Sequence, residues 1–159
     1  MMRIGHGYDA HRFLKGRPCI LCGVTVPSDV GPDGHSDADV PVHALMDALL
    51  GALALGDIGK MFPNSDEAYH GADSIELLKT VYTRVTALGY QLSNTDMTII
   101  CQNPRLAPYI GAMRENIAGA LDVPVDTVSV KATTEEKMGF TGEGLGMAAH
   151  AVVLLEKMA

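Results

Sequence analysis

The stretch Gly5–His11 reads Gly-His-Gly-Tyr-Asp-Ala-His and contains two of the three most informative side chains of the chain, Asp9 and His11. We expect it to form a β-strand, in which residues i and i+2 point to the same face, so that Asp9 and His11 can reach one ion together. His43 lies in the apolar-periodic stretch 42–53, which predicts a helix. The three side chains predict an Asp/His/His metal site with one open position. That is the ligand count of a catalytic zinc site rather than of a closed structural one.

Periodicity and turn residues predict the other elements. We expect an α+β fold in which one mixed sheet is covered by helices on one face. The bare face must be buried somewhere, which predicts an oligomer. The expected strands are 3–13, 18–26 with a turn at Cys22–Gly23, 92–101, 127–133 and 148–155; the expected helices run from the N-cap Asp39 to about Leu55, over 73–88 and over 108–121. Residues 28–38 predict a polar loop, 57–66 an irregular segment and 135–146 a Gly-rich segment.

Composition limits the class of protein. The 159 residues are the size of one domain, taken as 1–159, and 47% are hydrophobic, enough for a substantial core. A net charge of −7 argues against nucleic acid or an anionic membrane as a partner. The longest uncharged apolar run, Ala48–Gly56, is far short of the ~20 residues that span a bilayer, and no signal-peptide pattern is present. We expect a cytoplasmic protein.

The cysteines do not indicate a second metal site. Cys19 and Cys22 have CxxC spacing, which is found in zinc and redox sites. Here the pair lies in a strand-like run ending at Gly23, with no second CxxC, so we favour a structural role. Including Cys101, the odd count fits a reducing compartment.

Two polar segments could serve a phosphorylated ligand. Residues 34–39 place an imidazole, a hydroxyl and backbone N–H groups at a helix start, which suits a phosphate oxygen; the alternative is a capping loop. Residues 131–137 place hydroxyls beside carboxylates at a strand end, which suits a phosphate and a hard cation. The alternative there is a capping box of Thr133 and Glu136. We also expect Asp47, four residues after His43, to accept the proton of its non-ligating nitrogen; the alternative is a solvated carboxylate.

Five motifs carry a resemblance that covers essentially the whole chain. Residues 5–11, 35–39, 43–52, 56–59 and 130–134 resemble, in order, the motifs of the 2-C-methyl-D-erythritol 2,4-cyclodiphosphate synthase family. The resemblance implies a phosphorus–oxygen lyase of non-mevalonate isoprenoid biosynthesis. Such an enzyme converts 4-diphosphocytidyl-2-C-methyl-D-erythritol 2-phosphate to the cyclic diphosphate and CMP. It also implies a homotrimer with the sheets facing the three-fold axis and the active sites between subunits.

The resemblance also implies roles for individual residues. Asp9, His11 and His43 correspond to the zinc ligands, and Glu136 to a ligand of a second cation, Mg²⁺ or Mn²⁺. His35 and Thr134 correspond to the groups around the reacting phosphates. The implied substrate contacts are Ser36, Asp57, Gly59, Phe62, Asp66, Cys101, Gln102, Asn103, Arg105, Leu106, Ala107, Ala132, Thr133 and Phe140.

Three positions depart from the family pattern. Tyr8 stands where Phe is frequent, and Asn64 where Asp is common, which makes Asp66 the surer substrate contact. Glu143 stands where many members have an Arg that, with a Phe matching Phe140, lines a central cavity able to bind an isoprenoid diphosphate. We predict that Glu143 repels that anion.

Two other functions stay open at this point. Two His and one carboxylate also suit a non-haem Fe(II) oxygenase, although the phosphate-suited segments argue against it. A trimeric nucleotide-binding protein with a vestigial site is the other.

Overall fold

The computed structural model describes residues 1–159, and its centre is a five-stranded sheet of order β4-β1-β7-β5-β6. Strands β5 and β6 are parallel and all other pairs are antiparallel, so the predicted mixed sheet is confirmed. The strands are β1 (Met2–Lys15), β4 (Val30–Pro32), β5 (Tyr90–Ile100), β6 (Val128–Thr133) and β7 (Gly146–Lys157).

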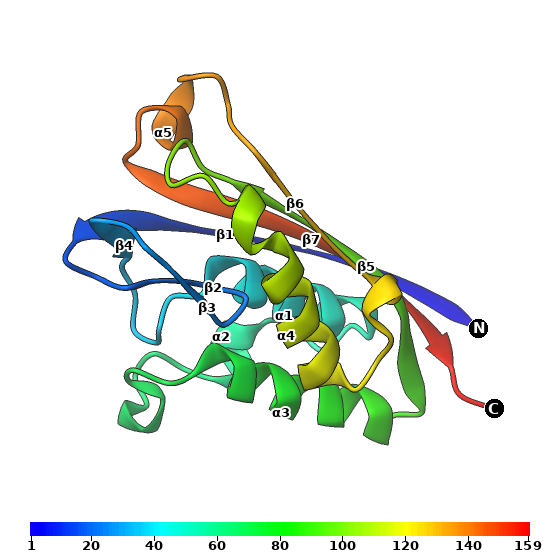
Figure 1. The fold of residues 1–159 in the computed structure, drawn as a ribbon. Helices are drawn as coiled ribbons and strands as arrows, with labels where there is room; N and C mark the ends of the chain where they lie inside the picture. Colours follow the sequence, from blue (N-terminus) through cyan, green and yellow to red (C-terminus); the bar gives the residue numbers. More distant parts are fainter.

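The long helices cover one face of this sheet, as predicted (Figure 1). They are α1 (Val40–Ala52), α3 (Ser74–Ala87) and α4 (Ile110–Leu121). There are also two single-turn helices. The first, α2 (Ile58–Met61), lies in the segment predicted to be irregular, and the second, α5 (Gly139–Gly142), lies in the Gly-rich segment. No helix has the length and apolar character needed to cross a bilayer.

The N-terminal region follows the predicted pattern in one place and differs from it in another. The segment 18–26 is a hairpin of β2 (Cys19–Leu21) and β3 (Val24–Val26) with the predicted turn at Cys22–Gly23, because both residues take positive φ and turn the chain. Strand β4 lies within the predicted loop 28–38, where it pairs with the end of β1. A three-residue edge strand with Gly and Pro carries almost no local signal, and pairing alone defines it.

The close approach of β1 to α1 determines where the candidate ligands lie. Gly5 and Gly7 face the helix, and a Cβ on them would stand 1.9 Å from the Ala48 carbonyl oxygen and 1.8 Å from the Ala44 carbonyl oxygen, respectively. Only glycine allows this backbone-to-backbone contact. The same face of β1 continues with Asp9, so the ligands begin where the glycines end.

Asp39 ties the hairpin to the start of α1. Its carboxylate is fully buried and accepts hydrogen bonds from the backbone N–H groups of Cys22 and Gly23, both at 2.8 Å, and of Val42 at 3.4 Å. The predicted N-cap is therefore confirmed, and it also serves a second element. Burial raises the pKa of Asp39 to about 7, against the opposing effect of the N–H groups that it accepts from.

The face of the sheet away from the helices is left uncovered. Ile4 is 73% exposed, Tyr8 46% and Val152 41%. On the same face His6 Nε2 lies 2.9 Å from Nδ1 of His150. Monomeric proteins seldom leave a row of large apolar side chains on a sheet in water.

Candidate metal centre

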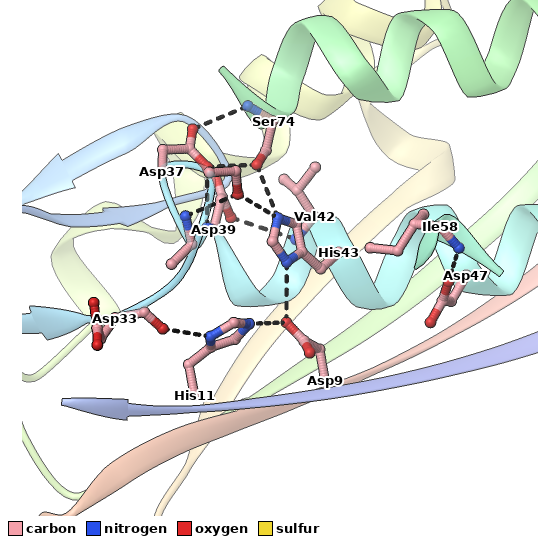
Figure 2. Close-up of polar contacts among 12 residues, drawn as sticks. Asp9, His11, Asp33, Asp37, Asp39, Val42, His43, Asp47, Ile58 and Ser74 are labelled. Atoms are coloured by element: carbon pink, nitrogen blue, oxygen red, sulfur yellow. Dashed lines mark hydrogen bonds and ion pairs between the residues drawn. The ribbon is translucent and has the colours of Figure 1, made fainter. Parts of the chain in front are cut away.

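Asp9, His11 and His43 come together as the sequence predicts. Each offers one ligand atom, and these atoms lie within 4.8 Å of one another. The Oδ2 atom of Asp9 is 3.0 Å from Nε2 of His11 and 3.2 Å from Nδ1 of His43. Figure 2 shows the first two side chains rising from β1 and His43 descending from α1 to meet them.

Hydrogen bonding fixes the tautomer of His11. The Asp33 carbonyl oxygen lies 2.6 Å from Nδ1 of His11, and a carbonyl can only accept. Nδ1 of His11 therefore carries the proton. In the neutral ring Nε2 must then present a lone pair to Asp9.

The outer nitrogen of His43 is held by two hydroxyls. Nε2 is 3.0 Å from Oγ of Ser74 and 3.1 Å from Oγ of Ser36. The Ser74 hydroxyl donates its proton to Oδ1 of Asp37, so its oxygen accepts from Nε2–H. The neutral His43 ring accordingly turns the lone pair of Nδ1 towards Asp9.

This arrangement fits a cation and is unfavourable without one. The Oδ2 atom of Asp9 is buried and has no hydrogen-bond donor once both rings are in these tautomers. Three lone pairs then converge on one point, and a bound cation removes their repulsion. Two imidazole nitrogens and one carboxylate oxygen, with an open fourth position, form a donor set that suits zinc.

In the metal-free protein a proton can take the place of the cation. The hydrogen bond to Asp9 raises the pKa of His11 above its usual value, against the opposing effect of burial. Burial alone would raise the pKa of Asp9, but when the rings carry the extra protons, hydrogen bonds from His11 and His43 outweigh burial and leave that pKa lowered. Metal binding therefore competes with protons at this centre.

The expected role of Asp47 is wrong. Its Oδ1 accepts a hydrogen bond from the backbone N–H of Ile58 at 2.8 Å, and Figure 2 shows it turned away from His43. Both residues lie on the one stripe of α1 that is not buried, as the i, i+4 spacing predicts. Lying on the same stripe does not bring the two side chains into contact. The carboxylate of Asp47 binds the first residue of α2 instead.

The metal ligands line a cavity of about 390 Å³ that also collects several predicted phosphate and substrate contacts. The carboxylate of Asp57 lies outside it and caps α2 by accepting from Lys60 N–H at 2.9 Å. The carboxylate of Asp66 accepts from Ala68 N–H at 3.0 Å. From the predicted set the lining includes His35, Ser36, Gly59 and Phe62, and Asn64 also lines it.

A second hollow gathers most of the other predicted contacts. Its volume is about 190 Å³, and it shares no lining residue with the metal-bearing cavity. Asn103, Glu136 and Phe140 lie outside both cavities. The lining residues of the second hollow are Cys101, Gln102, Pro104, Arg105, Leu106, Ala107, Ala132, Thr133 and Thr134.

The alternative of a capping box at Thr133 is wrong. Strand β6 ends at Thr133 and no helix starts there; the next, α5, begins at Gly139. Glu136 instead takes a positive φ of 53°, and its N–H donates to Thr134 Oγ1 at 3.3 Å. The carboxylate of Glu136 is left exposed at the end of the strand.

Three contributors to the centre were missed in the sequence. They are Asp33, through its carbonyl, and the Asp37–Ser74 pair behind His43. Asp37 belongs to the motif 35–39, where an aspartate in a polar loop gives no local sign of a role behind His43. Ser74 is 31 residues from His43 and resembles an ordinary first residue of a helix.

Comparisons with known proteins agree with this geometry. A family model described as the YgbB family matches residues 2–156. The chain is 59% identical over 154 residues to the 2-C-methyl-D-erythritol 2,4-cyclodiphosphate synthase of Trichlorobacter lovleyi, covering 97% of this chain and 98% of the relative. It is 61% identical to the protein of that name from Moorella thermoacetica, covering 97% and 94%.

A solved structure described as 2C-methyl-D-erythritol-2,4-cyclodiphosphate synthase in a CDP-bound form has a TM-score of 0.89 at 38% identity. The match covers 97% of this chain and 100% of that one.

Proposed function

This chain belongs to the YgbB family of 2-C-methyl-D-erythritol 2,4-cyclodiphosphate synthases, and from that premise we propose how its two hollows divide the reaction. The family reaction converts 4-diphosphocytidyl-2-C-methyl-D-erythritol 2-phosphate to 2-C-methyl-D-erythritol 2,4-cyclodiphosphate and CMP. We class it as a phosphorus–oxygen lyase reaction. The observation that carries the proposal is the convergence of three lone pairs in a cavity that also contains His35 and Ser36.

The substrate supplies its own nucleophile. An oxygen of the 2-phosphate attacks the phosphorus next to the methylerythritol, a new P–O bond closes the ring, and the P–O bond to CMP breaks with its electron pair leaving on CMP. The phosphate is already anionic at neutral pH, so the protein needs no strong general base. The obstacle is bringing one anion onto another, and positioning with charge neutralisation answers it.

Zinc held by Asp9, His11 and His43 would neutralise and orient the diphosphate through its open position. The protein's own donors complete that task. The imidazole of His35 lines the cavity, and its Nε2–H, which donates to the Asp66 carbonyl oxygen at 3.3 Å in this structure, would turn to a phosphate oxygen when substrate binds. The Ser36 hydroxyl lines the same cavity. With a chain of net charge −7, the metal is the main source of positive charge.

We assign the second hollow to the cytidine part of the substrate, and Thr134 at its edge to a phosphate. Glu136, exposed at the end of β6, is proposed as a ligand of a second cation, Mg²⁺ or Mn²⁺, between phosphates. The solved relative described as a CDP-bound form supports a cytidine nucleotide as ligand. Asp57, Asp66, Asn103 and Phe140 stay predicted substrate contacts, although they line neither hollow.

The two hollows suggest that one chain holds two incomplete halves of different active sites. They share no residue, and the uncovered sheet face requires burial. We propose a homotrimer that packs this face about its axis and joins the metal-bearing cavity of one subunit to the second hollow of a neighbour. Each active site then lies at a subunit interface.

The deciding experiment follows the reaction by ³¹P NMR. Purified protein with substrate and Mg²⁺ is expected to lose the diphosphate signals of the substrate and to gain those of CMP and the cyclic diphosphate. Absence of both products contradicts the proposed function and leaves a nucleotide-binding protein. Metal analysis of protein purified without added metal is expected to give zinc, and iron instead would favour the oxygenase alternative.

A further inference from the structure

We propose that Ser74 and Asp37 are positioning residues for His43, holding its ring in the tautomer that presents Nδ1 to a cation. The proposal rests on the metal-binding part of the function proposed above. Neither side chain lines the metal-bearing cavity, so neither is placed to touch a ligand there. Their effect has to pass through the imidazole.

The direction of the hydrogen-bond chain follows from its last member. An ionised Asp37 can only accept, so the proton between it and Ser74 belongs to the serine. The Ser74 oxygen then offers only lone pairs to Nε2 of His43, 3.0 Å away. Ser74 is fully buried, which leaves no room for water to reverse the pattern. The chain therefore runs one way, from Nε2–H to the carboxylate.

Asp37 is itself held on three sides. Its Oδ2 accepts from the Ser74 backbone N–H at 3.0 Å, and its Oδ1 accepts from Asp39 N–H at 3.1 Å. Its own backbone N–H donates to the Ala72 carbonyl oxygen at 3.1 Å. These bonds join the loop before α1 to the start of α3. The carboxylate is thus a fixed anchor behind the metal centre.

The anchor also leaves Ser36 free for the reaction. The Ser36 oxygen accepts from Ala38 N–H at 3.2 Å and faces Nε2 of His43 at 3.1 Å. Since Nε2 carries a proton, the Ser36 hydroxyl cannot donate to it. Its own proton has no acceptor in the chain and can be given to an anion in the cavity that it lines.

A carboxylate at the end of such a chain increases the basicity of the ligating nitrogen. Loss of outer partners of this kind typically costs 10- to 100-fold in metal affinity. We expect Ser74→Ala to weaken zinc binding by roughly that factor. Asp37→Asn is expected to weaken it similarly, because an amide lacks the charge and presents an N–H group to the Ser74 N–H. Affinity is measured by competition with a chromophoric chelator.

The matched control is Asp73→Asn. Asp73 directly precedes Ser74 and caps α3 by accepting from Ile75 N–H at 2.9 Å. Together with Asp37 it also lines a third cavity, separate from the two described above. Asparagine caps a helix about as well as aspartate. The control removes one negative charge from the same neighbourhood without a bond to the Ser74–His43 path. It is expected to keep the wild-type zinc affinity, and a loss equal to that of Asp37→Asn overturns the proposal.

A double-mutant cycle shows whether Asp37 acts on His43 through Ser74 or independently of it. Once Ser74→Ala removes the hydroxyl, adding Asp37→Asn is expected to cause little further loss of zinc affinity. If the losses of zinc affinity in the two single variants add fully in the double variant, the proposed path through Ser74 is overturned. Ser74→Ala keeps the backbone N–H that Asp37 binds, so it preserves the junction with α3. Urea unfolding of the metal-free variants shows whether folding is affected.

The tautomer gives a readout that a purely structural role would not move. ¹⁵N NMR of the metal-free protein at high pH is expected to show His43 protonated on Nε2 in the wild type. In Ser74→Ala we expect a mixture of tautomers, and an unchanged spectrum overturns the proposal. If the wild-type protein binds no divalent metal, the proposed metal centre fails and this inference fails with it. If the wild type binds zinc and Ser74→Ala binds it equally well, only this inference fails.

Discussion

On one face β1 presents Gly5 and Gly7, then Asp9 and His11, to helix α1, whereas on the other it presents Ile4 and Tyr8 to open space. Between Arg3 and Asp9 the covered face carries no side chain, because the helix backbone occupies the room that a Cβ on Gly5 or Gly7 would need. The bare face carries large apolar side chains that nothing in the chain covers. The first face is covered within one chain, and the second is the face that the proposed trimer would cover.

The largest effect is expected from filling the covered face. Gly7→Ala places a Cβ that would stand 1.8 Å from the Ala44 carbonyl oxygen, so helix and strand must separate. We expect a loss of about 3 kcal/mol or more in the free energy of unfolding, measured with urea. Gly111→Ala is the control, since Gly111 lies in α4 with nothing near its Cβ position. The control is expected to be neutral or slightly stabilising.

Removing a ligand tests the end of the covered face. His43→Ala is expected to lose bound zinc and roughly 10²-fold or more of the activity, because the metal supplies several kcal/mol of charge stabilisation. The circular dichroism spectrum should be unchanged. His150→Ala, on the bare face, serves as the control for metal content. Full zinc occupancy or full activity in His43→Ala refutes the assignment.

The bare face is tested by placing a charge on it. Val152 is 41% exposed within one chain, so Val152→Glu is expected to leave the subunit folded. In the proposed trimer it would bury three carboxylates together, and we expect monomers by analytical ultracentrifugation. Val125→Glu is the control, since Val125 is 44% exposed but lies outside the sheet. A trimeric Val152→Glu would mean that this face is not the interface.

A smaller effect concerns thiols on the covered side. Burial raises the pKa of Cys19 and of Cys101 to about 11 from the usual 9.0, a difference of 2 units. At pH 8 the native protein should hold roughly 100-fold less thiolate at each than an unfolded chain. Alkylation by iodoacetamide, followed by mass spectrometry, is expected only after unfolding. Rapid alkylation of the native protein would contradict a structural role for Cys19 and Cys22 and would favour a metal or redox role.

The smallest effect is an expected absence of binding. From the family resemblance we predict that Glu143 stands where many members have the Arg that would hold an isoprenoid diphosphate in the central cavity of the proposed trimer. Calorimetric titration with farnesyl diphosphate should therefore give no micromolar binding in the axial cavity. The variant Glu143→Arg tests the cause. If farnesyl diphosphate binds to the variant and not to the wild type, the negative charge of Glu143 is what prevents binding. Micromolar binding to the wild type contradicts the prediction.

The sequence predicted the features that have a local cause. The Asp39 cap, the helices and the Asp9–His11 pair follow from spacing and periodicity within a few residues. Strand β4 did not, because only its pairing with β1 defines it. The order of strands in the sheet also depends on contacts between distant segments.

The candidate site divides in the same way. Its inner ligands were predicted, but the group behind His43 was assigned to Asp47 on the same helix stripe, when Ser74 from another helix supplies it. Helical spacing places side chains on a face and gives no information on which segment packs against that face. The tautomers of His11 and His43 likewise depend on hydrogen bonds to the Asp33 carbonyl and to the Ser74–Asp37 pair, which the spacing of the sequence does not reveal.

The glycine contact between β1 and α1 has a consequence for which ions the centre can accept. Asp9 and His11 lie on the strand and His43 lies on the helix. The separation of β1 and α1, which Gly5 and Gly7 set, therefore determines the distance between the ligand atoms of the two elements. Zinc bonds to such donors are about 2.0–2.2 Å, whereas Ca²⁺ needs about 2.3–2.6 Å and more oxygens. A helix buried on all but one stripe cannot shift outward to admit the larger ion without losing core contacts. In the proposed metal centre the Gly5–Gly7 contact would therefore favour small ions through backbone packing, in addition to the preference that the donor atoms supply.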